Sequence, residues 1–157
     1  MRTSSFLSVL VLAAVFASVT AGWRGSEDIS AQTNSPKAGL TVGVSVSTDK
    51  ASYAAGESIV IELIVFNRTA QSLTFDFRNA QHYDFIIEDT EGTRVRRWAE
   101  GRMFAQVLGE ETLEPGREEV VYTETYAERL QPGGYKIIGA LISTNRPLSA
   151  SLMITIE

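Results

Sequence analysis

Residues 74–106 read TFDFRNAQHYDFIIEDTEGTRVRRWAEGRMFAQ, and this stretch decides the predicted fold. Apolar and polar side chains alternate over 73–77 and again over 83–87, and a third run ends at Trp98. The polar residues 78–82 separate the first two runs, and Glu91-Gly92 forms a turn before the third. Alternation with a period of two is typical of β-strands that bury one face. The stretch therefore predicts a three-stranded meander, which needs other strands to cover its apolar face.

The flanking sequence supplies those strands. Residues 58–67 are apolar on both faces, which predicts a central strand. The other predicted strands are 40–47, 118–125, 135–142 and 148–156, with 103–108 as a short strand or edge segment and 109–116 as a loop. No stretch of ten or more residues has a helical period. We therefore predict an all-β fold, an antiparallel immunoglobulin-like β-sandwich of about eight or nine strands.

The N-terminal residues are typical of an export signal. Arg2 precedes an apolar run over 6–19, and Val19-Thr20-Ala21 places small residues at the cleavage site. The run is shorter than the roughly 20 residues of a spanning helix, although an uncleaved anchor remains an alternative. We expect a signal peptide at 1–21, a flexible leader at 22–39 and the domain at 40–157. The protein is then periplasmic or secreted, with no stable membrane span after cleavage.

The charge and the cysteine content exclude several classes of function. The net charge is −5, and removing residues 1–21, which hold one basic and no acidic residue, makes it −6. This acidic balance argues against nucleic acid as a partner, because phosphate binding needs a basic face. The chain has no cysteine, so it has no disulfide, no thiolate metal site and no cysteine nucleophile.

The sequence contains no convincing catalytic or metal-binding pattern. His82 is the only histidine, and in a strand it would share a face with Asp84. No nucleophile motif accompanies this pair, so we interpret it as a polar pair at the start of a strand. The acidic residues near the turns do not have the spacing of a calcium loop. We expect no catalytic residue, no cofactor and no bound metal.

A basic cluster surrounds Trp98 in this acidic chain. The predicted protein-contact residues are Arg94, Arg96, Arg97, Arg102 and Met103. Strict alternation would place Arg94, Arg96 and Trp98 on one face and Val95 and Arg97 on the other. Two interpretations remain open. The arginines and the tryptophan form an interface, where both residue types are common. Alternatively, the arginines pair with Asp84, Glu88 and Glu91, and Trp98 caps the core.

Several short motifs occur in a fixed order along the chain. They are Gln-x-Tyr-Asp-Phe at 81–85, a Gly turn, Arg-Trp at 97–98, Phe-x-Gln at 104–106, Leu-x-Pro-Gly at 113–116 and Gly-Tyr at 134–135. Over 44–142 this pattern resembles the BsuPI-type intracellular proteinase inhibitor domain. The motif residues, which we interpret as structural, are Tyr83, Asp84, Phe85, Gly92, Trp98, Phe104, Gln106, Pro115, Gly116, Gly134 and Tyr135.

The resemblance implies an immunoglobulin-like sandwich that inhibits a subtilisin-type serine protease. The predicted export signal disagrees with the word "intracellular" in the family's description. We therefore expect a non-enzymatic exported protein-binding domain, with a serine protease or another envelope protein as its partner. Residues 99–103 and 109–115 are the candidate contact loops. The alternative is a structural or adhesive module of the bacterial envelope without a protease partner.

Overall fold

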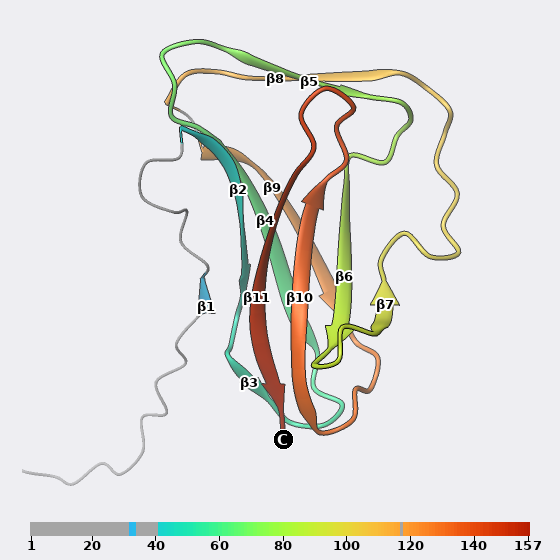
Figure 1. The fold of residues 1–157 in the computed structure, drawn as a ribbon. Coiled ribbons are helices and arrows are strands. Elements are labelled where there is room, and N and C mark those ends of the chain that lie inside the picture. The colour runs from blue at the N-terminus through green and yellow to red at the C-terminus, as the bar shows by residue number, and fades with distance from the viewer. Residues whose placement is uncertain (1–31, 34–40, 117) are drawn as a thin grey trace, which may run out of the picture.

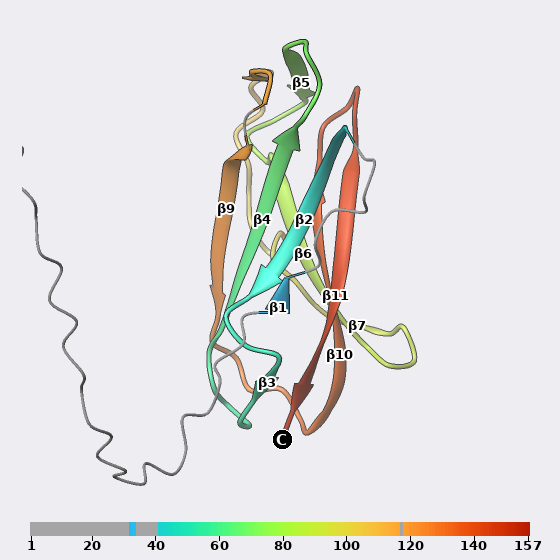
Figure 2. The ribbon, with the colours of Figure 1, turned by 90° about the vertical axis from the view of Figure 1, so that its left-hand side faces the viewer.

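The computed structural model describes residues 32–33, 41–116 and 118–157. The predicted signal peptide and most of the predicted leader lie outside these residues. The described chain is all-β, and its two main sheets pack face to face (Figure 1; Figure 2 gives the side view). This arrangement is the predicted immunoglobulin-like sandwich.

The first sheet contains the predicted central strand. Its order is β1 (Gln32–Thr33), β2 (Val42–Thr48), β4 (Ile59–Asn67) and β9 (Glu118–Tyr126), all antiparallel. β4 lies between β2 and β9, as its two apolar faces predicted. On its outer face Phe66 is buried over Gly43, where a Cβ would lie 2.6 Å from the phenyl ring. Glycine is therefore required at position 43, since a larger side chain would displace Phe66.

The second sheet faces the first across the core. Its order is β3 (Ser52–Tyr53), β11 (Leu148–Ile156), β10 (Gly133–Leu141), β6 (Tyr83–Asp89) and β7 (Arg94–Arg97). The pairs are antiparallel except for the short parallel pair of β3 with β11. β6 and β7 form the predicted hairpin around Gly92, whose φ of 82° fits the turn without a Cβ clash.

The first strand of the predicted meander has a different partner. β5 (Leu73–Phe77) pairs with β8 (Gly109–Leu113) in a two-stranded sheet that crosses one end of the sandwich (Figure 1). The three-stranded meander is therefore wrong for β5, and the predicted loop 109–116 contains a strand. Alternation predicts which residues of a strand are buried but not which strand it pairs with. Here the loop after β10 also binds β5, because Asp76 N–H donates to Asn145 Oδ1 and Thr144 N–H donates to the Asp76 carbonyl.

The core fills the space between the main sheets. Leu63 of β4 and Ile137 of β10 are fully buried at its centre. Phe75 and Phe77 of β5 close the end of the core under the two-stranded sheet. Each such side chain contributes roughly 1.5–3 kcal/mol when it leaves water. Since the chain has no cysteine, this burial holds the sandwich together without disulfides.

Candidate protein-contact site

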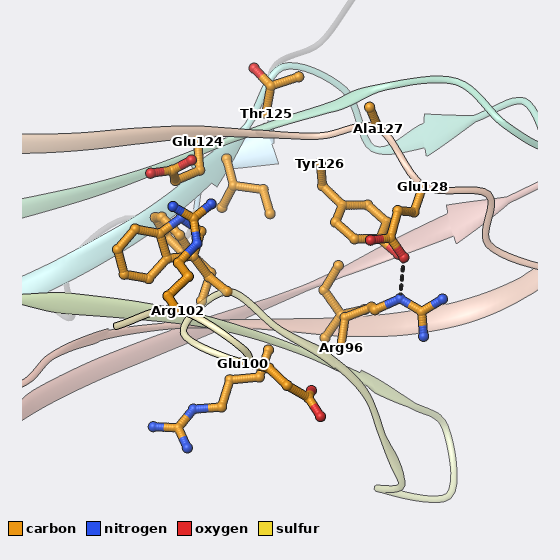
Figure 3. A pocket seen from close by; sticks show the side chains of 13 residues that line it. Arg96, Glu100, Arg102, Glu124, Thr125, Tyr126, Ala127 and Glu128 are labelled. Atoms are coloured by element: carbon orange, nitrogen blue, oxygen red, sulfur yellow. Dashed lines mark hydrogen bonds and ion pairs between the residues drawn. The ribbon is translucent and has the colours of Figure 1, made fainter. Parts of the chain in front are cut away.

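A groove of about 390 Å³ follows one open side of the sandwich (Figure 3). It lies where β7 forms the edge of one sheet and β9 forms the edge of the other. Its buried lining residues are Ile61, Phe85 and Ile87, and its charged lining residues are Arg96, Arg97, Arg102, Glu100, Glu124 and Glu128. The groove thus combines an apolar floor with charges of both signs.

Three stacked aromatic side chains connect the two sheets beside the groove. Tyr122 of β9 stacks on Tyr83 of β6, and Tyr83 stacks on Trp98, with ring centroids 4.4 Å apart in each pair. All three pack against the buried core, so Trp98 caps the core as one of the two interpretations predicted. The indole N–H of Trp98 is buried, and none of the described residues accepts its hydrogen bond.

Carboxylates bind the hydroxyl groups of this aromatic stack. Tyr83 O–H donates to Glu124, and Tyr122 O–H donates to Glu111 Oε2 at 3.0 Å. Burial raises the pKa of both tyrosines, and the neighbouring carboxylates raise it further because they disfavour a second negative charge. Away from the groove, burial and the hydrogen bond to Asp49 raise the pKa of Tyr53 to about 12.

These shifts predict a loss of stability at high pH. Tyrosine ionises near pH 10 when unfolded, and the folded protein holds Tyr53, Tyr83 and Tyr122 neutral above that value. Each contribution is therefore complete below about pH 10 and is lost as pH rises through the raised pKa of the folded state, which is about 12 for Tyr53. When the pH of the native protein is raised, we expect tyrosinate absorbance to appear well above pH 10, together with unfolding. In urea the same absorbance should appear near pH 10. Native tyrosines that all ionise near pH 10 without unfolding would contradict this assignment.

His82 and Asp84 do not form the pair that strand spacing suggested. His82 Nδ1 lies 2.7 Å from Glu111 Oε1, and its ring stacks on Phe77 with centroids 4.1 Å apart. Asp84 is 1% exposed and binds Arg97 Nε at 2.5 Å and the Ala99 N–H at 3.1 Å. His82 therefore links β6 to the two-stranded sheet, and Asp84 fixes the turn after β7.

A bulge changes which arginines share a face. The β6–β7 register shifts between Ile87 and Glu88, so that Ile87 faces Arg96 and Glu88 faces Arg94. Val95 is the additional residue and packs against the core together with Trp98, so strict alternation fails at this point. Arg96 Nε lies 2.6 Å from Glu128 Oε2 across the groove (Figure 3), and this ion pair connects β7 to the chain that follows β9.

Residues 102–108, here called the exposed segment, leave the groove and run to β8 without regular structure (Figure 1). Three of its apolar side chains face solvent: Met103 is 97% exposed, Leu108 86% and Val107 60%. The side chains on either side of Met103 contact Trp98 instead. The Arg102 guanidinium lies 4.3 Å from the centroid of the Trp98 ring, and the centroid of the Phe104 ring lies 5.6 Å from the same point. Residues 103–108, predicted as a short strand or edge segment, contain no strand.

The predicted contact residues gather around this site with one exception. Arg96, Arg97 and Arg102 line the groove, and Met103 follows Arg102 on the exposed segment, whereas Arg94 lies on β7 opposite Glu88. Sequence reasoning missed Glu124 of β9 and Glu128, two residues after its end, because only the folded chain brings them beside β7. The apolar pair Val107-Leu108, which lies outside any alternating run, was a usable signal for the exposed segment.

Five of the motif residues lie in the buried part of the sandwich or in its turns. Asp84, Phe85 and Tyr135 are buried, and Gly92 and Gly116 have positive φ in turns. No three histidine, aspartate or glutamate side chains of the described ranges come together as metal ligands. The same ranges contain no helix long and apolar enough to span a membrane.

Comparison with known proteins gives one family match. The model of a family described as "BsuPI: Intracellular proteinase inhibitor" matches residues 46–146. No curated protein matches the chain.

Solved structures with a similar fold are distant in sequence. Spo0M, a sporulation control protein from Bacillus subtilis, is 16% identical with a TM-score of 0.49, over 75% of this chain and 50% of that one. The CARDB domain of the PF1109 protein from Pyrococcus furiosus is 15% identical with a TM-score of 0.42, over 74% and 87%. A Paenibacillus cycloisomaltooligosaccharide glucanotransferase is 18% identical with a TM-score of 0.46, and the match covers 75% of this chain but only 14% of that enzyme.

Proposed function

The chain belongs to the BsuPI family of intracellular proteinase inhibitors, and from this membership we propose that it is a non-enzymatic protein-binding domain that inhibits a subtilisin-type serine protease. The proposed mechanism is steric. The protein occupies the substrate cleft of the protease and keeps peptide substrates out.

The exposed segment is the observation that carries this proposal. A steric inhibitor needs an exposed segment that can enter the narrow substrate cleft of the protease. Residues 102–108 form such a segment, with apolar side chains exposed beside the sandwich. Ordering a loop on binding costs affinity, so a scaffold that holds its loop in advance binds more tightly. The stack of Arg102 and Phe104 on Trp98 supplies such a scaffold.

The groove beside the segment adds contact area. A stable protein–protein interface buries about 800 Å² on each partner, which is more than a seven-residue segment offers. Arg96 and Arg102 lie on the same side of the sandwich, and arginine is frequent at interface hot spots. We therefore place the contact surface on the exposed segment and the adjacent groove rim.

We also propose that the protein is exported and meets its protease in the periplasm or outside the cell. The charged start, the apolar run over 6–19 and the small residues before Gly22 support this proposal. Mass spectrometry of protein purified from cells expressing the full chain should find an N-terminus at Gly22. An intact Met1 on soluble cytoplasmic protein would contradict export.

Titration of a protease tests the inhibitory function. Increasing amounts of the purified protein are added to a fixed amount of subtilisin-type protease with a fluorogenic peptide substrate. We expect activity to fall linearly and to vanish near one inhibitor per enzyme. Unchanged activity of a panel of serine proteases at micromolar protein would refute the proposal and favour the structural or adhesive alternative.

A further inference from the structure

We propose that Met103 is the side chain that enters the primary specificity pocket (S1) of the protease, and that the partner is a protease whose S1 pocket is deep and apolar. This inference rests on the proposed inhibitory function. It adds the specificity-determining residue and the class of protease.

The side chains on both sides of Met103 hold its position. Arg102 and Phe104 lie against the same Trp98 ring, while Met103 between them is 97% exposed. Trp98 in turn packs against the core and stacks on Tyr83. The fold therefore anchors the two neighbours on a rigid platform and directs the residue between them to solvent.

The backbone around Met103 is also held in place. Arg102 N–H donates to the Ala99 carbonyl at 3.2 Å, and the Ala105 carbonyl accepts from Ala80 N–H at 2.9 Å. Gln106 Nε2 donates to the Phe104 carbonyl at 3.1 Å. No residue of the exposed segment has positive φ. The segment is thus fixed on both sides of Met103 with the negative φ that a chain bound along a cleft requires.

The chemistry of the segment selects the type of pocket. Arg102, the basic residue, has its guanidinium over the indole ring, so it is not offered to an acidic S1 pocket of the trypsin type. Methionine is unbranched and flexible, and it fits deep apolar pockets of varied shape. Leu108 is similarly exposed, but no described side-chain contact anchors its neighbours Val107 and Gly109 on a common platform.

A change of specificity tests this assignment. Met103→Lys should weaken inhibition of the apolar-pocket protease at least about 100-fold, as for a central hot-spot residue. The same variant should gain inhibition of a trypsin-type protease, whose S1 pocket carries an aspartate. Met103→Leu should stay within about tenfold of the wild type, because it conserves volume and polarity. Met153→Lys is the matched control and should leave inhibition unchanged, because Met153 is exposed on β11, outside the groove and the exposed segment.

The outcomes separate the two proposals. If the wild type inhibits no protease, the inhibitory function itself fails. If the wild type inhibits, but Met103→Lys inhibits equally well or Met153→Lys weakens inhibition as much as Met103→Lys does, the assignment of Met103 is overturned. Because both side chains face solvent, the circular dichroism spectra of all variants should match the wild type.

Discussion

Replacing Asn67 by aspartate is expected to lower the free energy of unfolding by about 3–5 kcal/mol. Asn67 is fully buried at the end of β4. Its Nδ2 donates to the carbonyls of Gln71 at 2.8 Å, Leu113 at 3.0 Å and Glu114 at 3.3 Å. Its Oδ1 accepts from the N–H and the hydroxyl of Thr69. A carboxylate would set a buried charge against three carbonyl oxygens, and it would detach the end of β8 from the sandwich.

Asn145→Asp is the matched control for this substitution. Asn145 also donates to a carbonyl, that of Thr74 at 3.0 Å, but it is exposed, so water can replace its partner. We expect its cost to stay below about 1 kcal/mol. Urea unfolding with linear extrapolation measures both variants. Equal stabilities of the two variants would show that Asn67 does not hold the end of the sandwich.

Replacing Trp98 by alanine is expected to cost about 3 kcal/mol of stability and to weaken inhibition about 100-fold. The stability loss follows from the cavity left beside the core and from the lost stack on Tyr83. The inhibition loss follows because Arg102 and Phe104 both rest on the indole. Hydrogen exchange over residues 99–106 should rise in the variant, which would show that the segment has lost its order.

Trp98→Phe provides the control for this effect. Phenylalanine keeps an aromatic ring for the stack and removes the indole N–H, which is buried and has no acceptor in the described part of the chain. We expect it to stay within about 1 kcal/mol of the wild type and to inhibit within about tenfold. If Trp98→Ala inhibits as well as the wild type while still folded, the segment does not depend on the platform.

Most strands could be predicted because their side-chain patterns are local. The predicted strand over 148–156 matches β11, and the doubly apolar run over 58–67 is the central β4. Which strands pair with each other could not be predicted in the same way. The alternation of 73–77 is compatible with any neighbour, and the partner strand β8 begins 32 residues after β5 ends, at 109 against 77.

The site was predictable only in part for the same reason. The arginines around Trp98 stood out because basic residues are few in this acidic chain, and the Arg97–Asp84 pair was among the expected ion pairs. The bulge at Val95 was not visible in the pattern, since it depends on the register with β6. Glu128 became part of the site only through the approach of β9 to β7.

Binding to a protease with a blocked active site tests the central claim most directly. A subtilisin-type protease is prepared in two forms, one free and one carrying a covalent peptide inhibitor that fills S1 and the adjacent subsites. The affinity of the protein for each form is measured by titration calorimetry. If residues 102–108 occupy the cleft, the protein should bind the free enzyme and bind the blocked enzyme at least about 100-fold more weakly. Equal affinity for both forms would contradict the account, because the contact surface would then lie outside the cleft.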